Sequence, residues 1–452
     1  MAAPRSAHAA LLALLLGGLL APHAAAQGDW PMFRHDASHS GASGAPPTGT
    51  GGRFLWKAAT QGEVESSAAI VAGVVYIGSK DNAVYALDAA TGAQRWRFAT
   101  GGLVYGSPAV ANGTVFIGSY DKRLYALDAA TGAERWNVTT QGVVRSSPAV
   151  ADGLVFFGSN DHFVYALDAA TGAQRWATRT GAEVFYHPTV AAGVVYIGSY
   201  DQQLYALNAT TGVPVWTFMT GGFIRSTPAV AGGMVFVGSR DKHLYALDAA
   251  TGAPRWNYTS GDDVSAAPAV AGGIVYIGSQ DDNITALNAT DGRVVWQVRT
   301  GGPVVSSPAV VGGLVYVGSE DRTFRALDAA TGQLMWTFPV ARGIISSPSI
   351  ADGVVYFGSL DRNVYAVTAG PPASPPPLPP PGKPPSGNGT TGTPGDGSAA
   401  PAPAPPPGPP SSPAPASPGG AGQREDSALL LLGIGAAAVL GLWAWRGKRG
   451  AR

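Results

Sequence analysis

Arginine and aromatic residues recur in this sequence at intervals of forty residues, a pattern that can place their side chains on one surface. One column stands just before a Ser-Ser-Pro motif, and a second stands inside a Gly-Ser-x-Asp motif. Tyr186 and His187 join them because they replace the two serines before Pro188. The candidate residues are Tyr105, Tyr120, Arg145, Phe185, Tyr186, His187, Tyr200, Arg225 and Arg240. Guanidinium forks suit carboxylates or phosphates, and aromatic rings stack on sugars or apolar groups. These columns predict a ligand-binding face. The alternative is that they are ordinary variable surface positions.

A column of aspartates has the residue type of a metal site. The aspartates of the Gly-Ser-x-Asp motif are Asp81, Asp121, Asp161, Asp201, Asp241, Asp281, Asp321 and Asp361. A ring of carboxylates suggests calcium, but a radial repeat spreads such residues around a circumference. Aspartates in turns commonly accept hydrogen bonds from nearby backbone N–H groups. We therefore expect each carboxylate to bond its own turn, and we predict no metal site.

Other catalytic chemistry has less support in the sequence. The chain has no cysteine, and no segment resembles G-x-S-x-G, H-E-x-x-H or a P-loop. His162, His187 and His243 fall in different repeats, without a local carboxylate at metal-ligand spacing. The 29 basic residues balance the 29 acidic ones, which argues against a nucleic-acid partner. The sequence leaves enzymatic activity open and favours a non-catalytic protein.

The elements that position these columns follow from the tryptophans. Eight of them are spaced by forty residues without an insertion: Trp56, Trp96, Trp136, Trp176, Trp216, Trp256, Trp296 and Trp336. Periods of this size indicate solenoids, propellers or arrays. We predict a structural role for these rings, each packed on the neighbouring repeat and received by the following Thr-Gly turn.

One repeat, residues 142–180, divides into four short β segments at 144–150, 154–159, 163–169 and 173–179. Four strands in forty residues are typical of a propeller blade. The Gly-Ser-x-Asp segment occurs eight times, but the Thr-Gly turn that leads to a tryptophan, once varied to Asp291-Gly292, occurs only seven times. Residues 53–58, around the orphan Trp56, should therefore supply the outer strand of the last blade. The sequence predicts an all-β fold, an eight-bladed propeller of four-stranded antiparallel blades.

The run YALDAATGxxxW, beside GSxD and SSPAV, resembles the tryptophan-docking repeat of the pyrroloquinoline-quinone (PQQ) propeller family. Residues 30–34 and 39–41 resemble the lead-in of such proteins, so the similarity covers about residues 28–368. The resemblance implies either of two functions. Quinoprotein dehydrogenases hold PQQ and a calcium ion, whereas members such as the outer-membrane assembly protein BamB are non-catalytic. The chain lacks the long insertions and the cysteine pair of the dehydrogenases, so we expect no cofactor, with PQQ and calcium only in the alternative.

Both ends of the chain carry segments outside the propeller. An apolar run at 9–21 follows Arg5 and precedes small residues, as in a secretory signal peptide. Residues 369–425 hold 21 prolines in 57 positions, a composition that forms no core. Residues 427–445 carry no charge over 19 positions, and a basic tail follows them, which indicates a type I membrane span.

The predicted order is a signal peptide at 1–26, a lead-in at 27–51, the propeller at 52–368, a disordered Pro-rich linker at 369–426, a transmembrane helix at 427–445 and a cytoplasmic basic tail at 446–452. This order places the propeller outside the cytoplasm, at the cell surface or in a periplasm-equivalent space. We expect a membrane-anchored binding or scaffolding module for protein or carbohydrate ligands. A PQQ-dependent dehydrogenase is the alternative.

Overall fold

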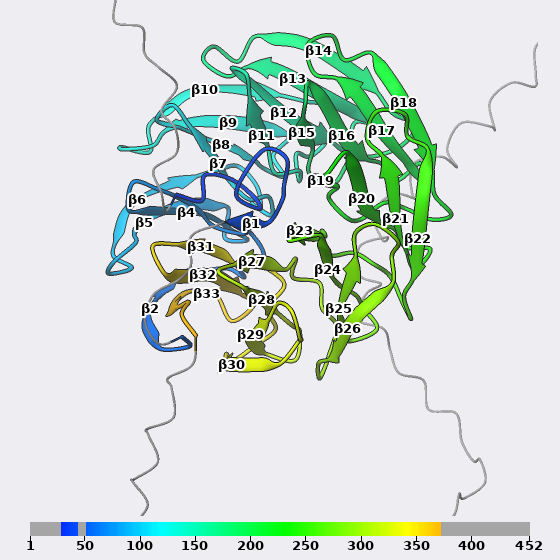
Figure 1. The fold of residues 1–452 in the computed structure, drawn as a ribbon. Helices are drawn as coiled ribbons and strands as arrows, with labels where there is room; N and C mark the ends of the chain where they lie inside the picture. The colour runs from blue at the N-terminus through cyan, green and yellow to red at the C-terminus, as the bar shows by residue number, and fades with distance from the viewer. Residues whose placement is uncertain (1–28, 44–50, 372–452) are drawn as a thin grey trace, which may run out of the picture. The chain divides into compact units, whose positions relative to one another are not determined.

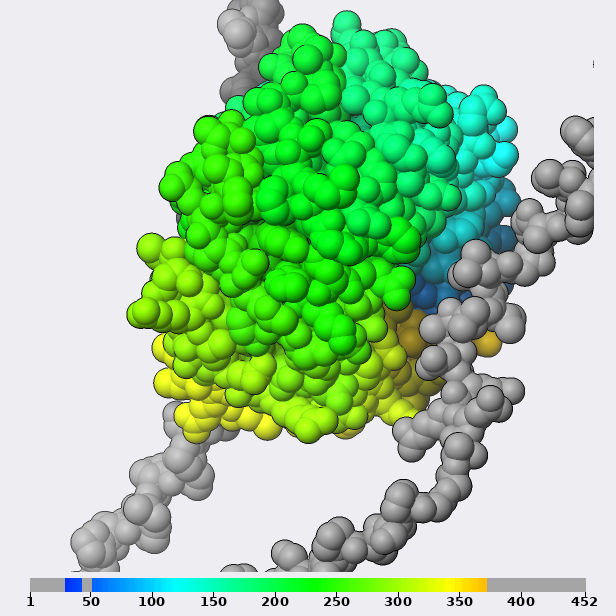
Figure 2. Space-filling view, turned by 90° about the vertical axis from the view of Figure 1, so that its right-hand side faces the viewer, coloured from blue at the N-terminus to red at the C-terminus, as the bar shows by residue number. Residues whose placement is uncertain are grey.

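Each forty-residue repeat forms a four-stranded antiparallel blade in the computed structural model, which describes residues 29–43 and 51–371. Eight blades surround a common centre (Figure 1), so the predicted all-β eight-bladed propeller is confirmed. Seen from the side, the outer surfaces of neighbouring blades adjoin one another (Figure 2). The predicted signal peptide, transmembrane helix and basic tail, and almost all of the linker, lie outside the described residues. Within those residues, no helix is long and apolar enough to cross a membrane.

Strands at the same position of each blade have nearly the same length. The inner strands are β3 (Ala69–Val71), β7 (Ala109–Ala111), β11 (Ala149–Ala151), β15 (Thr189–Ala191), β19 (Ala229–Ala231), β23 (Ala269–Ala271), β27 (Ala309–Val311) and β31 (Ser349–Ala351). The second strands are β4 (Val74–Ser79), β8 (Thr114–Gly118), β12 (Leu154–Ser159), β16 (Val194–Gly198), β20 (Met234–Gly238), β24 (Ile274–Gly278), β28 (Leu314–Gly318) and β32 (Val354–Ser359).

The third strands are β5 (Ala83–Asp88), β9 (Arg123–Asp128), β13 (Phe163–Asp168), β17 (Gln203–Asn208), β21 (His243–Asp248), β25 (Asn283–Asn288), β29 (Thr323–Asp328) and β33 (Asn363–Thr368). The outer strands are β6 (Gln94–Ala99), β10 (Glu134–Thr139), β14 (Gln174–Arg179), β18 (Pro214–Met219), β22 (Pro254–Thr259), β26 (Val294–Arg299), β30 (Leu334–Pro339) and β2 (Phe54–Ala59). The apolar second and third strands are almost entirely buried, so the core lies between the blades.

The N-terminal strand β2 closes the ring. It pairs antiparallel with β33, and Trp56 lies opposite Ala366. The last blade therefore combines three strands from the end of the propeller with one from its beginning. This is the closure that the missing eighth Thr-Gly turn indicates, and it leaves no blade with three strands.

The inner strand is shorter than the sequence suggests. We expected a strand over residues 144–150, but β11 starts only at Ala149, so the first five residues of that prediction are wrong. Pro148 has no N–H to donate to a ladder. The N–H of Ser147 is donated instead to Nδ1 of His187 in the next blade, at 2.7 Å. Residues 144–148 therefore join blades and do not extend a sheet.

Serines of the same motif join other pairs of blades in the same way. The Ser67 N–H donates to Oγ of Ser107 at 2.9 Å, and the Ser107 N–H donates to Oγ of Ser147 at 2.7 Å. Across the closure, the Ser347 N–H donates to Oγ of Ser67 at 2.9 Å. All of these groups are buried, so a broken link would leave an unsatisfied N–H, at a cost of roughly 1–3 kcal/mol.

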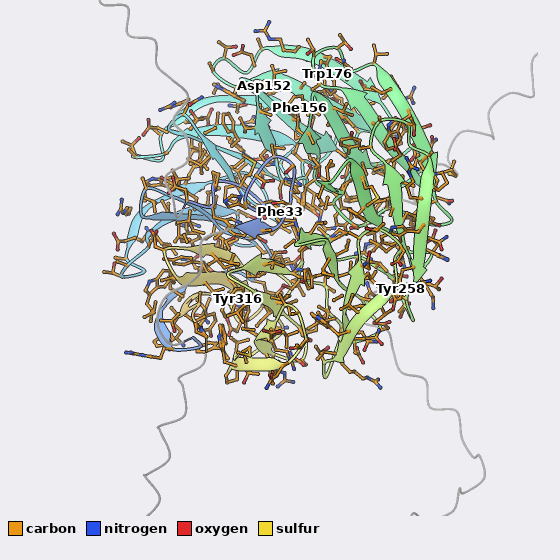
Figure 3. The ribbon with its side chains drawn as sticks, viewed as in Figure 1. Phe33, Asp152, Phe156, Trp176, Tyr258 and Tyr316 are labelled. Atoms are coloured by element: carbon orange, nitrogen blue, oxygen red, sulfur yellow. The ribbon has the colours of Figure 1, made fainter. Side chains whose placement is uncertain are left out.

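The tryptophans of the outer strands dock on the following blade. Trp176, labelled in Figure 3, donates its indole N–H to the carbonyl of Ala209 at 2.9 Å. Its ring lies against Gly212, where an added Cβ would approach the ring to 2.7 Å. Gly212 also has a φ of 73°, so both space and backbone conformation require glycine. Trp136 departs from this pattern, because its buried indole nitrogen has no hydrogen-bond partner.

Residues 29–43, which we call the plug, run around the inside of the ring. Figure 1 shows this segment in dark blue among the inner strands, and Figure 3 places Phe33 at the centre. Trp30 forms a bridge with Ile70, and β1 (Ala42–Ser43) pairs in parallel with β27. Plug carbonyls also accept N–H groups from the inner strands of five blades: Val110, Val190, Val230, Val270 and Val310. The plug thus closes one end of the channel that the inner strands enclose.

Candidate binding site

Side chains of the two variable columns meet at the end of the channel away from the plug. We call this region the channel mouth and define it as Tyr105, Tyr120, Arg145, Phe185, Tyr186, Tyr200, Arg225 and Arg240. Each comes from a link between blades or from the turn between a second and a third strand. The plug binds Val110, five residues beyond Tyr105 on the same inner segment, which places mouth and plug at opposite ends.

Arg145 lies at the centre of an aromatic cluster in the channel mouth. Its guanidinium carbon is 5.0 Å from the ring centroid of Tyr105, 5.9 Å from that of Phe185 and 6.0 Å from that of Tyr186. Cation–π contacts of this kind favour a guanidinium that is partly removed from water. The carboxylate of Glu65 is 4.0 Å from Arg145 but only 2.5 Å from the ammonium of Lys80. Lys80, and not Arg145, therefore neutralises Glu65.

Three aromatic rings form a row beside this cluster. The ring centroids of Phe185 and Tyr200 are 4.4 Å apart, and Tyr200 stacks on Phe223 at 5.0 Å with an interplanar angle of 6°. Tyr105 and Tyr120 also pair, at 4.7 Å. The rings that the sequence suggests for sugar stacking thus cover one another.

Phe223 belongs to this site although the sequence reading did not single it out. A third variable column, two residues before the first, carries Glu63, Leu103, Val143, Glu183, Phe223, Asp263, Pro303 and Gly343. Comparing repeats at that position would have identified Phe223 and Asp263. Phe223 is 38% exposed, so it forms the outer end of the aromatic row.

We number the blades 1 to 8 along the chain, from the inner strand β3 to the inner strand β31, and count each link with the inner strand that follows it. The two arginines of blade 5 differ in their partners. Arg240 pairs with the carboxylate of Asp263 at 2.8 Å. Arg225 donates from Nε to the hydroxyl of Tyr186 at 3.0 Å, and it has no carboxylate within 4.0 Å in the described part of the chain. Charge interaction with Tyr186 raises the pKa of Arg225. Arg225 thus forms no ion pair in the described residues, and the nearby Asp263 is bound by Arg240.

The opposite side of the mouth carries acids. Burial, and then the charge of Glu65, raise the pKa of Glu320 in blade 7. Glu63 and Glu65 of blade 1 both contact Lys80, and Glu63 also pairs with Arg342 at 2.9 Å. The channel mouth is therefore electrically asymmetric, with unpaired arginine in blades 3 to 5 and carboxylates in blades 7 and 1.

His187 lies deeper than the other predicted site residues. Besides its bond from Ser147, its ring is 4.5 Å from the ring of Phe33 in the plug. Burial, and then the charges of His39 and Arg145, lower its pKa well below the ordinary value. A neutral imidazole between blade and plug joins these two parts of the molecule.

The plug contributes two buried polar residues. Arg34 donates from Nη1 to the carbonyl of Ala267 at 2.6 Å and from Nε to the carbonyl of His39 at 3.3 Å. The Thr189 hydroxyl lies 3.0 Å from Nδ1 of His39. Burial lowers the pKa of Arg34 to about 9 and that of His39 to about 3. Within the described residues, Nη2 of Arg34 and Nε2 of His39 are buried and have no hydrogen-bond partner.

A plug contact lies at each of two irregular repeats. Most blades carry Ser-Ser-Pro or a close variant, but blade 4 has His187 at the second position and blade 6 has Ala267. His187 packs on Phe33, and the carbonyl of Ala267 accepts from Arg34. The departures from the motif were visible in the sequence, but their partner was not, because the plug lies outside the repeat.

The aspartates of the Gly-Ser-x-Asp motif bond to backbone. Asp121 accepts the N–H of Arg123 in its own turn at 3.1 Å and that of Gly101 in the preceding link at 2.7 Å. The carboxylate of Asp121 also accepts a hydrogen bond from the hydroxyl of Tyr125, at 2.5 Å. Among the described residues, no three His, Asp or Glu side chains gather in a way that could hold a metal ion.

A cleft on the opposite face lies between blades 1 and 2, next to the plug. Its lining includes Met32, Val71, Tyr76 and Val110, with Arg95 and Arg135 nearby. Both arginines are already paired, with aspartates 2.7 Å away. This cleft lacks the unpaired charge that distinguishes the channel mouth.

Repeats, ring closure and tryptophan docking define the molecule as an eight-bladed propeller of the PQQ-repeat class. A family model described as "Outer membrane protein assembly factor BamB" matches residues 47–147, 124–222, 219–309 and 299–370. The chain belongs to this family. No curated protein sequence matches it.

Solved structures share the fold at low sequence identity. BamB from Moraxella catarrhalis is 21% identical, with a TM-score of 0.62 over 70% of this chain and 99% of that one. The computationally designed Ika8 protein is 19% identical, with a TM-score of 0.64 over 71% and 100%. Quinohemoprotein alcohol dehydrogenase from Comamonas testosteroni is 17% identical, with a TM-score of 0.67 over 78% and 82%. Because these proteins differ in function, the fold alone does not select one.

Proposed function

We propose that this protein is a membrane-anchored, extracytoplasmic binding or scaffolding module whose channel mouth binds a protein ligand. The observation that carries the proposal is the channel mouth itself. In an otherwise regular repeat, aromatic and arginine side chains from blades 2 to 5 converge on one end of the channel. Faces with such clusters are typical of recognition sites. The family description, an assembly factor, is consistent with a protein partner.

A protein ligand fits the mouth better than a carbohydrate does. Sugar stacking needs a free aromatic face, but Tyr200 lies between Phe185 and Phe223, and Tyr105 faces Tyr120. Arginine and tyrosine at the centre of a partly desolvated surface are common anchors in protein interfaces.

The test is capture of partners by the full-length protein and by substituted forms. Phe185→Ala, Tyr186→Ala and Arg225→Ala should each reduce recovery of a specific partner several-fold, with little change in melting temperature. Arg293→Ala is the matched control, because the Arg293 side chain is 87% exposed on an outer turn. Equal loss with the control, or no loss with any of the three, would place the binding surface elsewhere.

Anchoring is a separate part of the proposal. Residues 427–445 should retain the protein in membranes through an alkaline carbonate wash, and a chain ending after Gly420 should be released in soluble form. Recovery of the full-length chain in the carbonate supernatant would contradict the anchor.

A PQQ-dependent dehydrogenase is the second candidate, because the fold is shared with a quinohemoprotein alcohol dehydrogenase. Its test is quinone absorbance and dye-linked alcohol oxidation by protein prepared with PQQ and calcium. Activity that requires both would favour the enzyme over the binding module.

A further inference from the structure

Two arginines at the mouth lack a close carboxylate of their own. Arg225 forms no ion pair within 4.0 Å in the described residues, and Asp263, whose charge acts on Arg225, is bound by Arg240. Arg145 has only Glu65 at 4.0 Å, and that carboxylate is bound closely by Lys80. The other cations of the mouth, Lys80 and Arg240, are paired at 2.5 to 2.8 Å. The unpaired charge is thus confined to one side of the channel.

Arg145 and Arg225 flank Tyr186: one faces its ring, and the other donates to its hydroxyl. Both come from links between blades at the channel mouth. A ligand that enters the mouth therefore meets two guanidinium groups.

Such a pair is costly in the absence of an anion. A guanidinium partly removed from water without a close counter-ion loses solvation that neutral hydrogen bonds only partly replace. The Arg145 side chain is 27% exposed, and it lies against aromatic rings. An anion would supply the charge-assisted hydrogen bonds that those rings do not.

We propose that the channel mouth receives an acidic peptide segment of a protein partner, with its carboxylates bound to Arg145 and Arg225. The proposal rests on the protein-binding function above and names the chemistry of the partner. An extended peptide is narrow and carries carboxylates on one side at every second residue, about 7 Å apart. Glu320, on the other side of the mouth, repels acids, so the segment binds against blades 3 to 5.

The experiment measures fluorescence anisotropy of a fluorescein-labelled octaglutamate peptide with the full-length protein. Binding should weaken as salt rises, and an octaglutamine peptide should not bind. The double variant Arg145→Gln/Arg225→Gln should weaken binding about tenfold or more. Arg293→Gln/Arg299→Gln is the matched control. It makes the same change in net charge at side chains that are 87% and 76% exposed, and it should leave binding unchanged.

The outcomes separate this proposal from the broader one. Equal octaglutamate affinity for the mouth variant and its control would overturn the acidic-segment proposal. It would not overturn protein binding if partner capture still depends on Phe185 and Tyr186. A glucuronic acid oligomer that binds more tightly than octaglutamate, with the same dependence on Arg145 and Arg225, would replace the peptide by an acidic glycan.

Discussion

The two ends of the propeller use their charged residues in opposite ways. One end carries the Thr-Gly turns, and we call it the turn face. There Asp168 accepts the N–H groups of Ala170 and Thr171 and is bound by Arg175 at 2.7 Å, all within one blade. At the channel mouth, Arg225 contacts a tyrosine of a different blade and forms no ion pair in the described residues. Because the carboxylate of each such turn finds its partners within the same blade, the turn can repeat as a structural unit. At the mouth, a ligand that supplies a carboxylate to the arginine would lower the free energy of the bound state.

Removal of the N-terminal strands should have the largest effect. A chain of residues 60–420 lacks both the plug and β2, so the last blade keeps an exposed edge and one end of the channel loses its closure. We expect aggregation or a melting temperature lower by ~10 °C or more, relative to residues 27–420. Differential scanning calorimetry measures this difference. Equal melting of the two chains would show that neither segment supports the ring.

Trp176 and Phe185 provide the direct comparison between the two ends. Trp176→Ala should cost about 3–5 kcal/mol in denaturant unfolding, because it opens a cavity against Gly212 and leaves the Ala209 carbonyl unpaired. Phe185→Ala should cost only roughly 1 kcal/mol while it weakens ligand binding. A stability loss at Phe185 as large as that at Trp176 would remove the distinction between a structural end and a binding end.

The contact between plug and blade 4 should give a smaller coupling. Phe33→Ala and His187→Ser each remove one side of the ring contact, and the serine restores the residue found in other blades. In a double-mutant cycle we expect a coupling energy of about 1 kcal/mol, measured by urea unfolding. Additive effects would mean that His187 is irregular for a reason other than the plug.

Acid should weaken the turn face by a modest amount. Arg95 and Thr91 lower the pKa of Asp88 to about 2, and equivalent partners lower the pKa values of Asp168 and Asp248 to about 2. A lowered pKa stabilises the fold above the ordinary value near 3.8, and this contribution is lost as pH falls from about 4 to about 2. Melting curves at pH 6, 4 and 2.5 measure the loss. The triple Asp→Asn variant at these positions should show a smaller dependence on pH, and an unchanged dependence would contradict the assignment.

The sequence was sufficient for the parts of the fold that repeat. The motif counts indicate β2 as the closing strand. The last repeat lacks the turn and the tryptophan-bearing outer strand, and Trp56, before the first repeat, is the tryptophan left over. The plug could not be derived this way. Residues 29–43 occur once and have no period, so nothing in their spacing shows that Arg34 reaches Ala267 or that Phe33 meets His187.

The candidate site was accessible from sequence only as a set of positions. Columns place Phe185 and Tyr200 at one end of the channel, but they do not show that the rings would cover each other. They also do not show which arginine finds an acid, because Arg240 and Arg225 look alike until Asp263 is seen beside one of them. Pairing depends on distances across blades, which a forty-residue period does not encode.

The closing blade also determines where the molecule bears mechanical load. The chain enters the ring at Gly51 and leaves it at Pro371, and the N–H of Gly51 donates to the Pro371 carbonyl at 2.8 Å. Tension on the outgoing chain is first carried by the few hydrogen bonds that join residues 51–53 to residues 368–371. Beyond them it acts on β33, which is held by β2 on one side and β32 on the other. Under a pull from its C-terminal side, the ring therefore yields at the one blade built from both ends of the chain.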